Sequence, residues 1–218
     1  MKTPKIVKQL CALVGAASLL ATTSAFATIS YNGTYTGTLS LSLAYGDAIA
    51  VNSSGLGTFD SFCLNSTVYA DSGTTYNYTS SDTITPANSG GPATVTLGTA
   101  WLYSEFTSGG LASYGYVYGD ASSAVQLQDA IWYLQGSPGG VDNAFVVDAQ
   151  NAVGASNATN ASGGAYGVFA LTLTTPNGAY AQPILGMVPE PSTVVAGVLL
   201  LLPFGVSTVR ILRKDKVS

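Results

Sequence analysis

The basic residues of this chain are confined to its two ends, and this distribution limits what the rest can become. All seven Lys and Arg of the 218 residues fall within 2–8 and 210–216, and the chain has no His. Nine of the 11 acidic residues lie between residues 28 and 188, where no cation balances them. We therefore expect two short functional ends and one acidic body, rather than a single uniform domain.

The missing cations exclude several classes of function for the body. Nucleic-acid binding requires Lys or Arg against the phosphates, so we expect no nucleic-acid partner. Ser-His-Asp and Cys-His hydrolases need an imidazole, and Schiff-base chemistry needs a lysine. The body also has no Asp-x-Asp-x-Asp-Gly loop that would predict a calcium site. We expect a protein that is not an enzyme and that uses no metal and no cofactor.

Residues 1–27 predict a secretory signal peptide. Three lysines precede an apolar run from residue 10 to residue 21, and Ala25 and Ala27 form a small-x-small cleavage site. These parts come in the order that export requires. The mature chain is therefore expected to begin at Thr28.

Residues 187–216 predict a membrane-anchored tail. An uncharged run over about 193–209 is slightly shorter than the roughly 30 Å hydrocarbon core that a transmembrane helix must cross. The basic residues after it are expected to stay in the cytoplasm, which leaves the body outside. The motif before the span is Val188, Pro189, Glu190 and Pro191, and the basic cluster after it is Arg210, Arg213, Lys214 and Lys216.

This tail resembles the PEP-CTERM sorting signal of Gram-negative, biofilm-forming bacteria, in which a Pro-Glu-Pro motif, one span and a basic end follow each other. The resemblance implies an exosortase-type enzyme that recognises the tail and removes it. It also implies an association with exopolysaccharide. The protein is then expected to be exported, anchored in the inner membrane, and later placed on the cell surface or outside the cell.

The body, residues 28–186, is long enough for one domain, which we predict to be mainly β, a β-sandwich or barrel-like, with one to three short helices. Alternation of Leu and polar residues over Thr34–Ala44 predicts a strand with Leu39, Leu41 and Leu43 on one face. Other predicted strands are Gly57–Leu64, Thr75–Tyr78, Ala93–Leu97, Gly115–Tyr118, Tyr166–Thr174 and Ala179–Ile184. The predicted helices are Trp101–Phe106, Ser122–Leu134, with Ser122 or Ser123 as its cap, and Asp142–Val153.

Cys63 is the one cysteine that remains after removal of the signal peptide. It is either a buried inert thiol, a partner in an intermolecular disulfide, or a reactive group. Phe62-Cys63-Leu64 and Leu127-Gln128-Asp129-Ala130-Ile131-Trp132 resemble the cysteine and glutamine motifs of the Cys-Gln thioester domains of bacterial surface proteins. Trp101-Leu102-Tyr103 resembles a segment found between these motifs. The resemblance implies an internal thioester between Cys63 and Gln128, and a covalent adhesin.

The chemistry suits a chain without histidine. The thiol attacks the glutamine carboxamide and expels ammonia, and a surface amine or a polysaccharide group of the target later attacks the acyl carbon. Water competes, so we expect a partly closed apolar pocket. Its predicted walls are Phe62, Leu127, Ile131 and Trp132. Gln126 and Gln135 are the rival glutamines.

Two other functions remain open. The first is a passive structural or glycan-associated domain, in which exposed tyrosines stack on sugars. The tyrosines considered are Tyr76, Tyr78, Tyr103, Tyr114, Tyr116 and Tyr118. The second is a carboxylate hydrolase, which needs two acids facing a cleft. Glu105 is the one glutamate of the body, and no acid is its obvious partner.

Overall fold

The computed structural model describes residues 35–88 and 91–187, and in this part of the chain six strands form one antiparallel sheet of order β3-β2-β1-β4-β5-β6. The strands are β1 (Thr36–Leu43), β2 (Ile49–Ser53), β3 (Gly57–Ser61), β4 (Thr75–Ser81), β5 (Val168–Thr174) and β6 (Ile184–Met187). The helices are α1 (Leu97–Ser108), α2 (Ala121–Leu134) and α3 (Ala144–Val153), with short 3₁₀ segments η1 (Gly110–Tyr114) and η2 (Ala165–Gly167).

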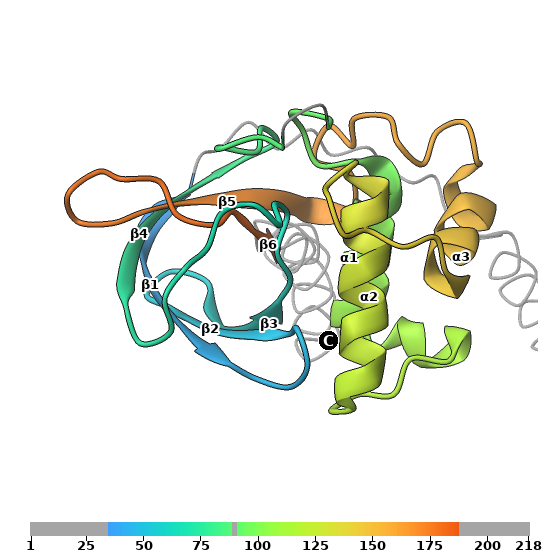
Figure 1. Cartoon of the computed structure of the whole chain (residues 1–218), viewed down its shortest axis with the longest axis horizontal. Helices are drawn as coiled ribbons and strands as arrows, with labels where there is room; N and C mark the ends of the chain where they lie inside the picture. Colours follow the sequence, from blue (N-terminus) through green and yellow to red (C-terminus); the bar gives the residue numbers. More distant parts are fainter. Residues whose placement is uncertain (1–34, 89–90, 188–218) are drawn as a thin grey trace, which may run out of the picture.

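The two outer strands of the sheet approach each other and nearly close a barrel. The segment after β3 runs beside β6, where the Leu185 N–H donates to the Phe62 carbonyl at 3.0 Å and the Leu64 N–H donates to the Pro183 carbonyl at 2.9 Å. The Ser61 hydroxyl also donates to the Leu185 carbonyl at 2.6 Å. The prediction of a mainly β domain with one to three short helices is confirmed: the described residues form a nearly closed, barrel-like sheet with three α-helices, and not the sandwich alternative (Figure 1).

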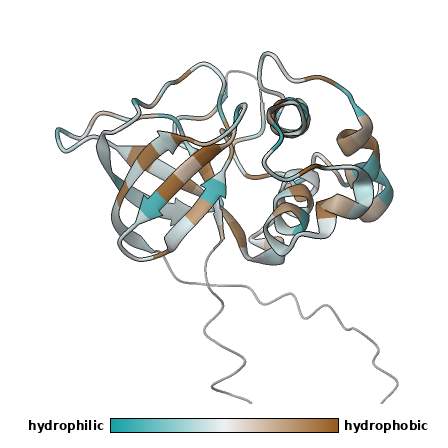
Figure 2. Ribbon diagram, turned by 90° about the horizontal axis from the view of Figure 1, so that it is seen from below, coloured by the Kyte–Doolittle hydropathy of each residue, from teal (hydrophilic) through white to brown (hydrophobic). Residues whose placement is uncertain are grey.

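The barrel and the helices form two layers of one domain, as Figure 1 shows. Sheet residues such as Leu39, Val51 and Leu173 form one buried cluster. The helices pack with Phe62 and Leu64 in a second, larger cluster. Alternation of hydrophobic and hydrophilic residues along the strands, visible in Figure 2, gives each strand an inner and an outer face.

Along β1 the predicted alternation holds except at its end. Leu39 and Leu41 are 2% and 5% exposed, whereas Leu43 is 81% exposed. Leu43 is the last residue of the strand, where the chain turns toward β2, so no neighbouring layer covers it. This exposed leucine lies at the mouth of the pocket described below.

Two predicted strands are wrong, one is displaced, and one strand was missed. The displaced strand is Ala179–Ile184, which shares only Ile184 with β6, because the residues before Ile184 make only an isolated bridge at Tyr180. Ala93–Leu97 makes only isolated bridges, because the Thr96 hydroxyl accepts from the Thr99 N–H and starts α1. Gly115–Tyr118 is a turn after η1, where Gly115 takes a left-handed conformation and Tyr116 packs edge-on against Phe106. Strand β2 has too short an apolar alternation to stand out in the sequence.

The three predicted helices are present with longer or shifted ends. The cap of α2 is not Ser122 or Ser123 but Asp120, whose carboxylate accepts from the Ser123 N–H at 2.8 Å. The carboxylate also suits the positive end of the helix dipole.

The predictions for the ends of the chain concern residues outside the described part. They are the signal peptide 1–27 with its site at Ala25 and Ala27, the Val188–Pro191 motif, the span 193–209 and the basic cluster 210–216. Among residues 35–88 and 91–187, no helix has the length and apolar character needed to cross a bilayer.

The N-cap of α2 provides a test of the fold. Asp120→Ala removes the acceptor for the Ser123 N–H, so we expect the free energy of unfolding to fall by about 1 kcal/mol in urea titrations. Asp120→Asn keeps an acceptor oxygen, so its free energy of unfolding should fall by no more than a few tenths of that amount. An equal loss in both variants would contradict the capping role.

Candidate functional site

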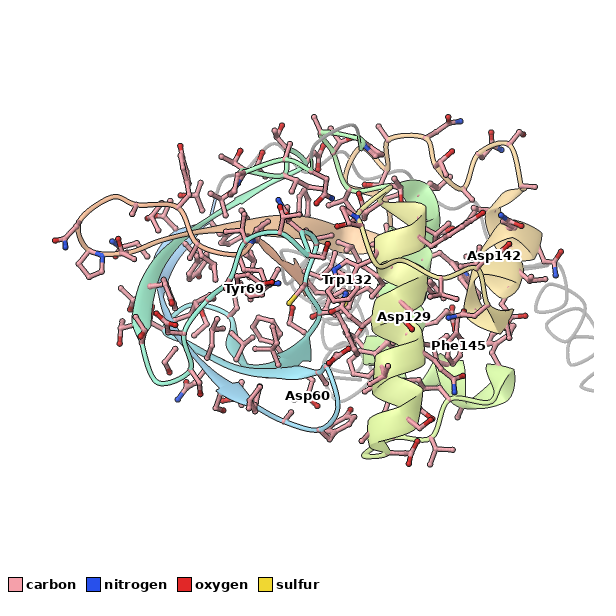
Figure 3. All side chains as sticks on the ribbon, viewed as in Figure 1. Asp60, Tyr69, Asp129, Trp132, Asp142 and Phe145 are labelled. Atoms are coloured by element: carbon pink, nitrogen blue, oxygen red, sulfur yellow. The ribbon has the colours of Figure 1, made fainter. Side chains whose placement is uncertain are left out.

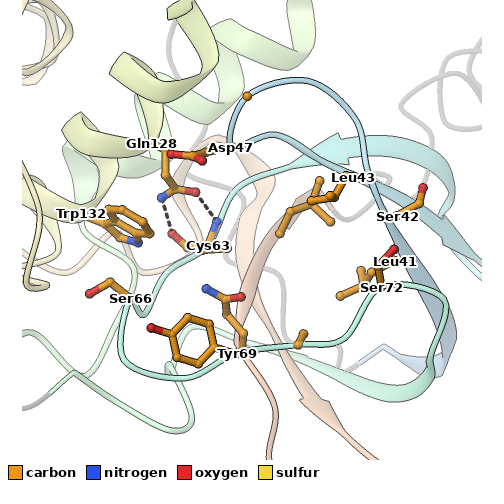
Figure 4. Close-up of a pocket in the computed structure, with 14 residues that line it drawn as sticks. Leu41, Ser42, Leu43, Asp47, Cys63, Ser66, Tyr69, Ser72, Gln128 and Trp132 are labelled. Carbon is orange, nitrogen blue, oxygen red and sulfur yellow. Dashed lines mark hydrogen bonds between the residues drawn. The ribbon is translucent and has the colours of Figure 1, made fainter. Parts of the chain in front are cut away.

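A pocket of about 370 Å³ opens where the barrel meets α2. Four segments line it: the end of β1 with the turn into β2, the loop over residues 63–72, α2, and the segment before β6 that carries Gln182. Figure 4 shows Cys63, Gln128 and Asp47 facing this pocket from the first three of these segments. Leu41, Leu43, Ile49 and Trp132 belong to its apolar wall. The pocket therefore combines one thiol, the two carboxamides of Gln128 and Gln182, and one carboxylate with apolar surface.

The Gln128 side chain lies against the backbone of Cys63. The Cys63 N–H donates to Gln128 Oε1 at 2.7 Å, and Gln128 Nε2 donates to the Cys63 carbonyl at 2.8 Å (Figure 4). Gln128 is fully buried and Cys63 is 8% exposed. The structure thus brings together two residues that lie 65 positions apart in the sequence.

The barrel seam explains why Cys63 receives a side chain. Phe62 and Leu64 use their backbone groups on one side, against Pro183 and Leu185. Because backbone groups alternate in direction along an extended chain, the N–H and carbonyl of Cys63 point to the other side. No strand follows there in the described sheet, and the Gln128 amide takes its place.

Burial keeps the Cys63 thiol protonated. The pKa of Cys63 is raised from 9.0 to about 12, mainly by removal from water and in part by the negative charge of Asp47, while a hydrogen bond with the Gln182 side chain opposes the shift. A free thiol here is a weak nucleophile at neutral pH. Any reaction of this sulfur must therefore move its proton as well.

The predicted pocket walls are only partly correct. Trp132 lines the pocket from α2, one turn after Gln128, and Figure 3 shows it between the helix and the barrel. Phe62, Leu127 and Ile131 do not line it: each is fully buried in the larger core cluster. The reason is that the apolar face of α2 packs on the domain core, so only its edge reaches the pocket.

The indole nitrogen of Trp132 is buried and has no hydrogen-bond acceptor among the described residues. The ring is held by its surroundings, since Gly139 packs on it and the Ser137 N–H donates to the Trp132 carbonyl at 2.8 Å.

The two rival glutamines lie elsewhere. Gln126 is exposed on the opposite side of α2 and reaches Ser122. Gln135 is buried against Thr96, near the start of α1. A glutamine that the sequence analysis missed, Gln182, lies beside the Cys63 sulfur and donates to the Asn65 carbonyl at 3.1 Å. No sequence signal indicated it, because its place depends on closure of the barrel.

Asp47, Ser66 and Tyr69 were also missed as pocket residues. Ser66 is fixed by hydrogen bonds with the Ser137 hydroxyl at 2.9 Å and the Pro138 carbonyl at 2.6 Å, whereas Tyr69 is 79% exposed at the mouth. Each belongs to a turn or loop without periodicity, so no sequence pattern distinguishes them.

The exposure of the tyrosines and the positions of the acids bear on the two alternatives, sugar stacking and a carboxylate hydrolase. Of the six tyrosines considered for sugar stacking, four are buried, and only Tyr114 and Tyr118 are clearly exposed, at 42% and 43%. Among the described residues, one carboxylate, Asp47, lines the pocket, and Glu105 does not. A carboxylate hydrolase therefore lacks its second acid in this pocket.

The fold and the pocket define a barrel-and-helix domain with a buried Cys-Gln contact at its seam. No protein-family model matches the chain, and no curated protein and no solved structure matches it.

The structural role of the Gln128 amide is testable without any covalent bond. In a Cys63→Ala background, Gln128→Ala leaves a buried N–H and a buried carbonyl unpaired, and we expect a loss of about 2 to 4 kcal/mol in the free energy of unfolding. Gln126→Ala, on the exposed face of the same helix, should change it by less than about 0.5 kcal/mol in the same urea titration. Equal effects would show that the amide does not hold the seam.

Proposed function

We propose that Cys63 and Gln128 form an internal thioester and that the protein is a covalent adhesin of the bacterial surface. The observation that carries the proposal is the docking of the Gln128 amide on the Cys63 backbone at 2.7 and 2.8 Å. In this arrangement a rotation about the Cys63 Cα–Cβ bond decides whether the sulfur faces the amide carbon.

Formation of the bond balances without an external reactant. The Cys63 sulfur attacks the Gln128 side-chain carbon, the thiol proton passes to the amide nitrogen, and ammonia leaves. The amide oxygen carries the negative charge of the tetrahedral intermediate. The Cys63 N–H already donates to this oxygen at 2.7 Å, so it supports the charge as an oxyanion donor does.

The residues around Gln128 suit a thioester that must resist hydrolysis. The Gln128 side chain is fully buried, and Leu41, Ile49 and Trp132 line the approach. Exclusion of water from this wall slows hydrolysis, while the open mouth beside Leu43 and Tyr69 admits a larger target.

The acyl acceptor must come largely from another molecule. Residues 28–188 contain no lysine, so a neighbouring copy of the body offers no lysine amine to the thioester. A surface amine of a host or matrix partner fits this condition, and a polysaccharide group is the second possibility.

We further propose that the two ends of the chain deliver the body to the cell surface. The N-terminal signal exports the chain, and the PEP-CTERM-like tail holds it in the inner membrane until an exosortase-type enzyme removes the tail. The body then acts at the cell surface or in the biofilm matrix.

Mass spectrometry of the intact secreted protein tests the thioester. We expect a mass about 17 Da below that of the mature sequence, set by the ammonia that leaves. Cys63→Ala and Gln128→Ala should both restore the full mass, whereas Gln182→Ala should keep the deficit. Full mass in the unmodified protein, or a deficit that disappears only in Gln182→Ala, would contradict the Cys63–Gln128 bond.

Release of the thiol provides a pH test. Methylamine should open the bond and leave a free Cys63 whose alkylation by iodoacetamide rises about tenfold per pH unit from pH 7 to 10 without a plateau, because burial raises the pKa of this thiol to about 12. The urea-unfolded protein should level off near pH 9. A plateau near that pH in the folded protein would contradict a buried thiol.

A second candidate function is a passive surface domain. It is favoured by the fact that the two Gln128 hydrogen bonds already satisfy a buried backbone, which gives this residue a purely structural reason to be there. Full mass in the native protein, together with the stability loss expected for Gln128→Ala, would favour this function.

A further inference from the structure

We infer that Asp47 is the proton-transfer group of the site, which takes a proton from the attacking amine and delivers it to the Cys63 sulfur. This inference rests on the proposed thioester and adds to it a residue that neither sequence motif contains. Of the described residues that line the pocket, Asp47 alone carries a formal charge at neutral pH, and no Lys, Arg or His between residues 28 and 188 can neutralise it.

The electrostatic influence of Asp47 reaches the reacting groups. Burial is the main cause that raises the pKa of the Cys63 thiol and of the Asp129 carboxyl on α2, and the charge of Asp47 raises both as well. Asp129 does not line the pocket, whereas Asp47 faces it together with Gln128 and Cys63 (Figure 4). Asp47 itself is exposed, so a cationic group can approach it from solvent.

The position of Asp47 is imposed by the residue before it. Gly46 has a φ of +54°, and a Cβ on it would lie 2.3 Å from the Ala121 carbonyl oxygen at the start of α2. Both conditions require glycine. The turn therefore packs directly on the helix that carries Gln128, and further hydrogen bonds between Ala44, Tyr45 and Ala48 close it. Asp47 is the next residue, and it lies where this turn lines the pocket.

The chemistry of the second step needs such a group. When an amine attacks the thioester carbon, its nitrogen becomes positively charged and the carbonyl oxygen becomes negative. The C–S bond breaks as this oxygen re-forms the carbonyl, and the departing sulfur takes the electron pair. In this site a thiolate is disfavoured, since burial raises the pKa of Cys63 to about 12. The sulfur must receive a proton as it leaves.

Asp47 links the loss of a proton from the amine to the protonation of the departing sulfur. Its carboxylate accepts the proton that the amine nitrogen loses and gives it to the Cys63 sulfur, so the products are an amide on Gln128, a neutral thiol and an unchanged carboxylate. No histidine is needed, which agrees with a body that has none. The same negative charge concentrates protonated amines at the mouth in preference to neutral sugar hydroxyls.

The test uses the full secreted chain and methylamine as the probe. Thioester content is measured first by the 17 Da mass deficit, about one ammonia, and the rate of methylamine addition is then followed by the gain in mass. Asp47→Asn should keep the mass deficit and react about 10²-fold more slowly, as expected for the loss of a proton-transfer group. Asp47→Glu should recover at least about a tenth of the original rate.

Two further variants separate proton transfer from a general effect of charge. Asp129→Asn removes a nearby acid that does not line the pocket and should react within about twofold of the original rate. Asp47→Ala should regain part of its rate when formate is added, because the vacated space in the pocket admits a small carboxylate.

The results of these experiments separate the role of Asp47 from the existence of the thioester. An unchanged methylamine rate in Asp47→Asn with the mass deficit present would overturn the role of Asp47 and leave the thioester standing. Equal slowing in Asp129→Asn, or no effect of formate on Asp47→Ala, would also overturn it. Absence of the deficit in the unmodified chain would overturn the proposed function and this inference with it.

Discussion

The contact between the Gln128 amide and the Cys63 backbone is the interaction on which both the structure and the proposed chemistry depend. It lies where the chain after β3 meets β6, so it joins the seam of the barrel to helix α2. A side-chain amide has the donor and acceptor of a peptide group, which is why one glutamine can replace a missing strand. The helical layer is thereby tied to the barrel by directional bonds as well as by apolar packing.

The same contact places structural stability and reactivity in one residue. The hydrogen bond from the Cys63 N–H to Gln128 Oε1 persists in a thioester, since this oxygen stays. The bond from Nε2 to the Cys63 carbonyl is lost with ammonia. Formation of the thioester therefore gives up one buried hydrogen bond, which costs about 1 to 3 kcal/mol, in exchange for a covalent link across 65 positions.

The absence of cations from the body is the second constraint. No cation between residues 28 and 188 can neutralise Asp47, and under the proposed function no lysine of a neighbouring body can reach the acyl group. An acidic exterior also favours approach of cationic partners over like-charged copies. Under the proposed function, one compositional feature thus limits self-reaction and selects the target.

The sequence predicted those strands and helices whose apolar residues recur at a regular spacing. Leucine alternation identified β1, and apolar spacing identified α2 and α3, because burial on one face leaves a period in the sequence. The expected strand at Ala93–Leu97 failed because a threonine cap outweighed local β-propensity, and the one at Gly115–Tyr118 failed because a left-handed glycine breaks the extended chain there. Phe62, Leu127 and Ile131 were recognised as apolar but assigned to the wrong place, since hydrophobicity predicts burial and not which cavity a side chain faces.

By itself the sequence determined the charge division of the chain, the β-rich class of the body, and the singling out of Cys63 and Gln128 as a pair to examine. These are properties of residue identity and short-range spacing. Only the tertiary structure decided that Gln128, not Gln126 or Gln135, reaches Cys63, and that Asp47 and Gln182 lie beside them. The reason is that the barrel seam joins segments more than 50 positions apart, and contacts over such distances leave no period in the sequence.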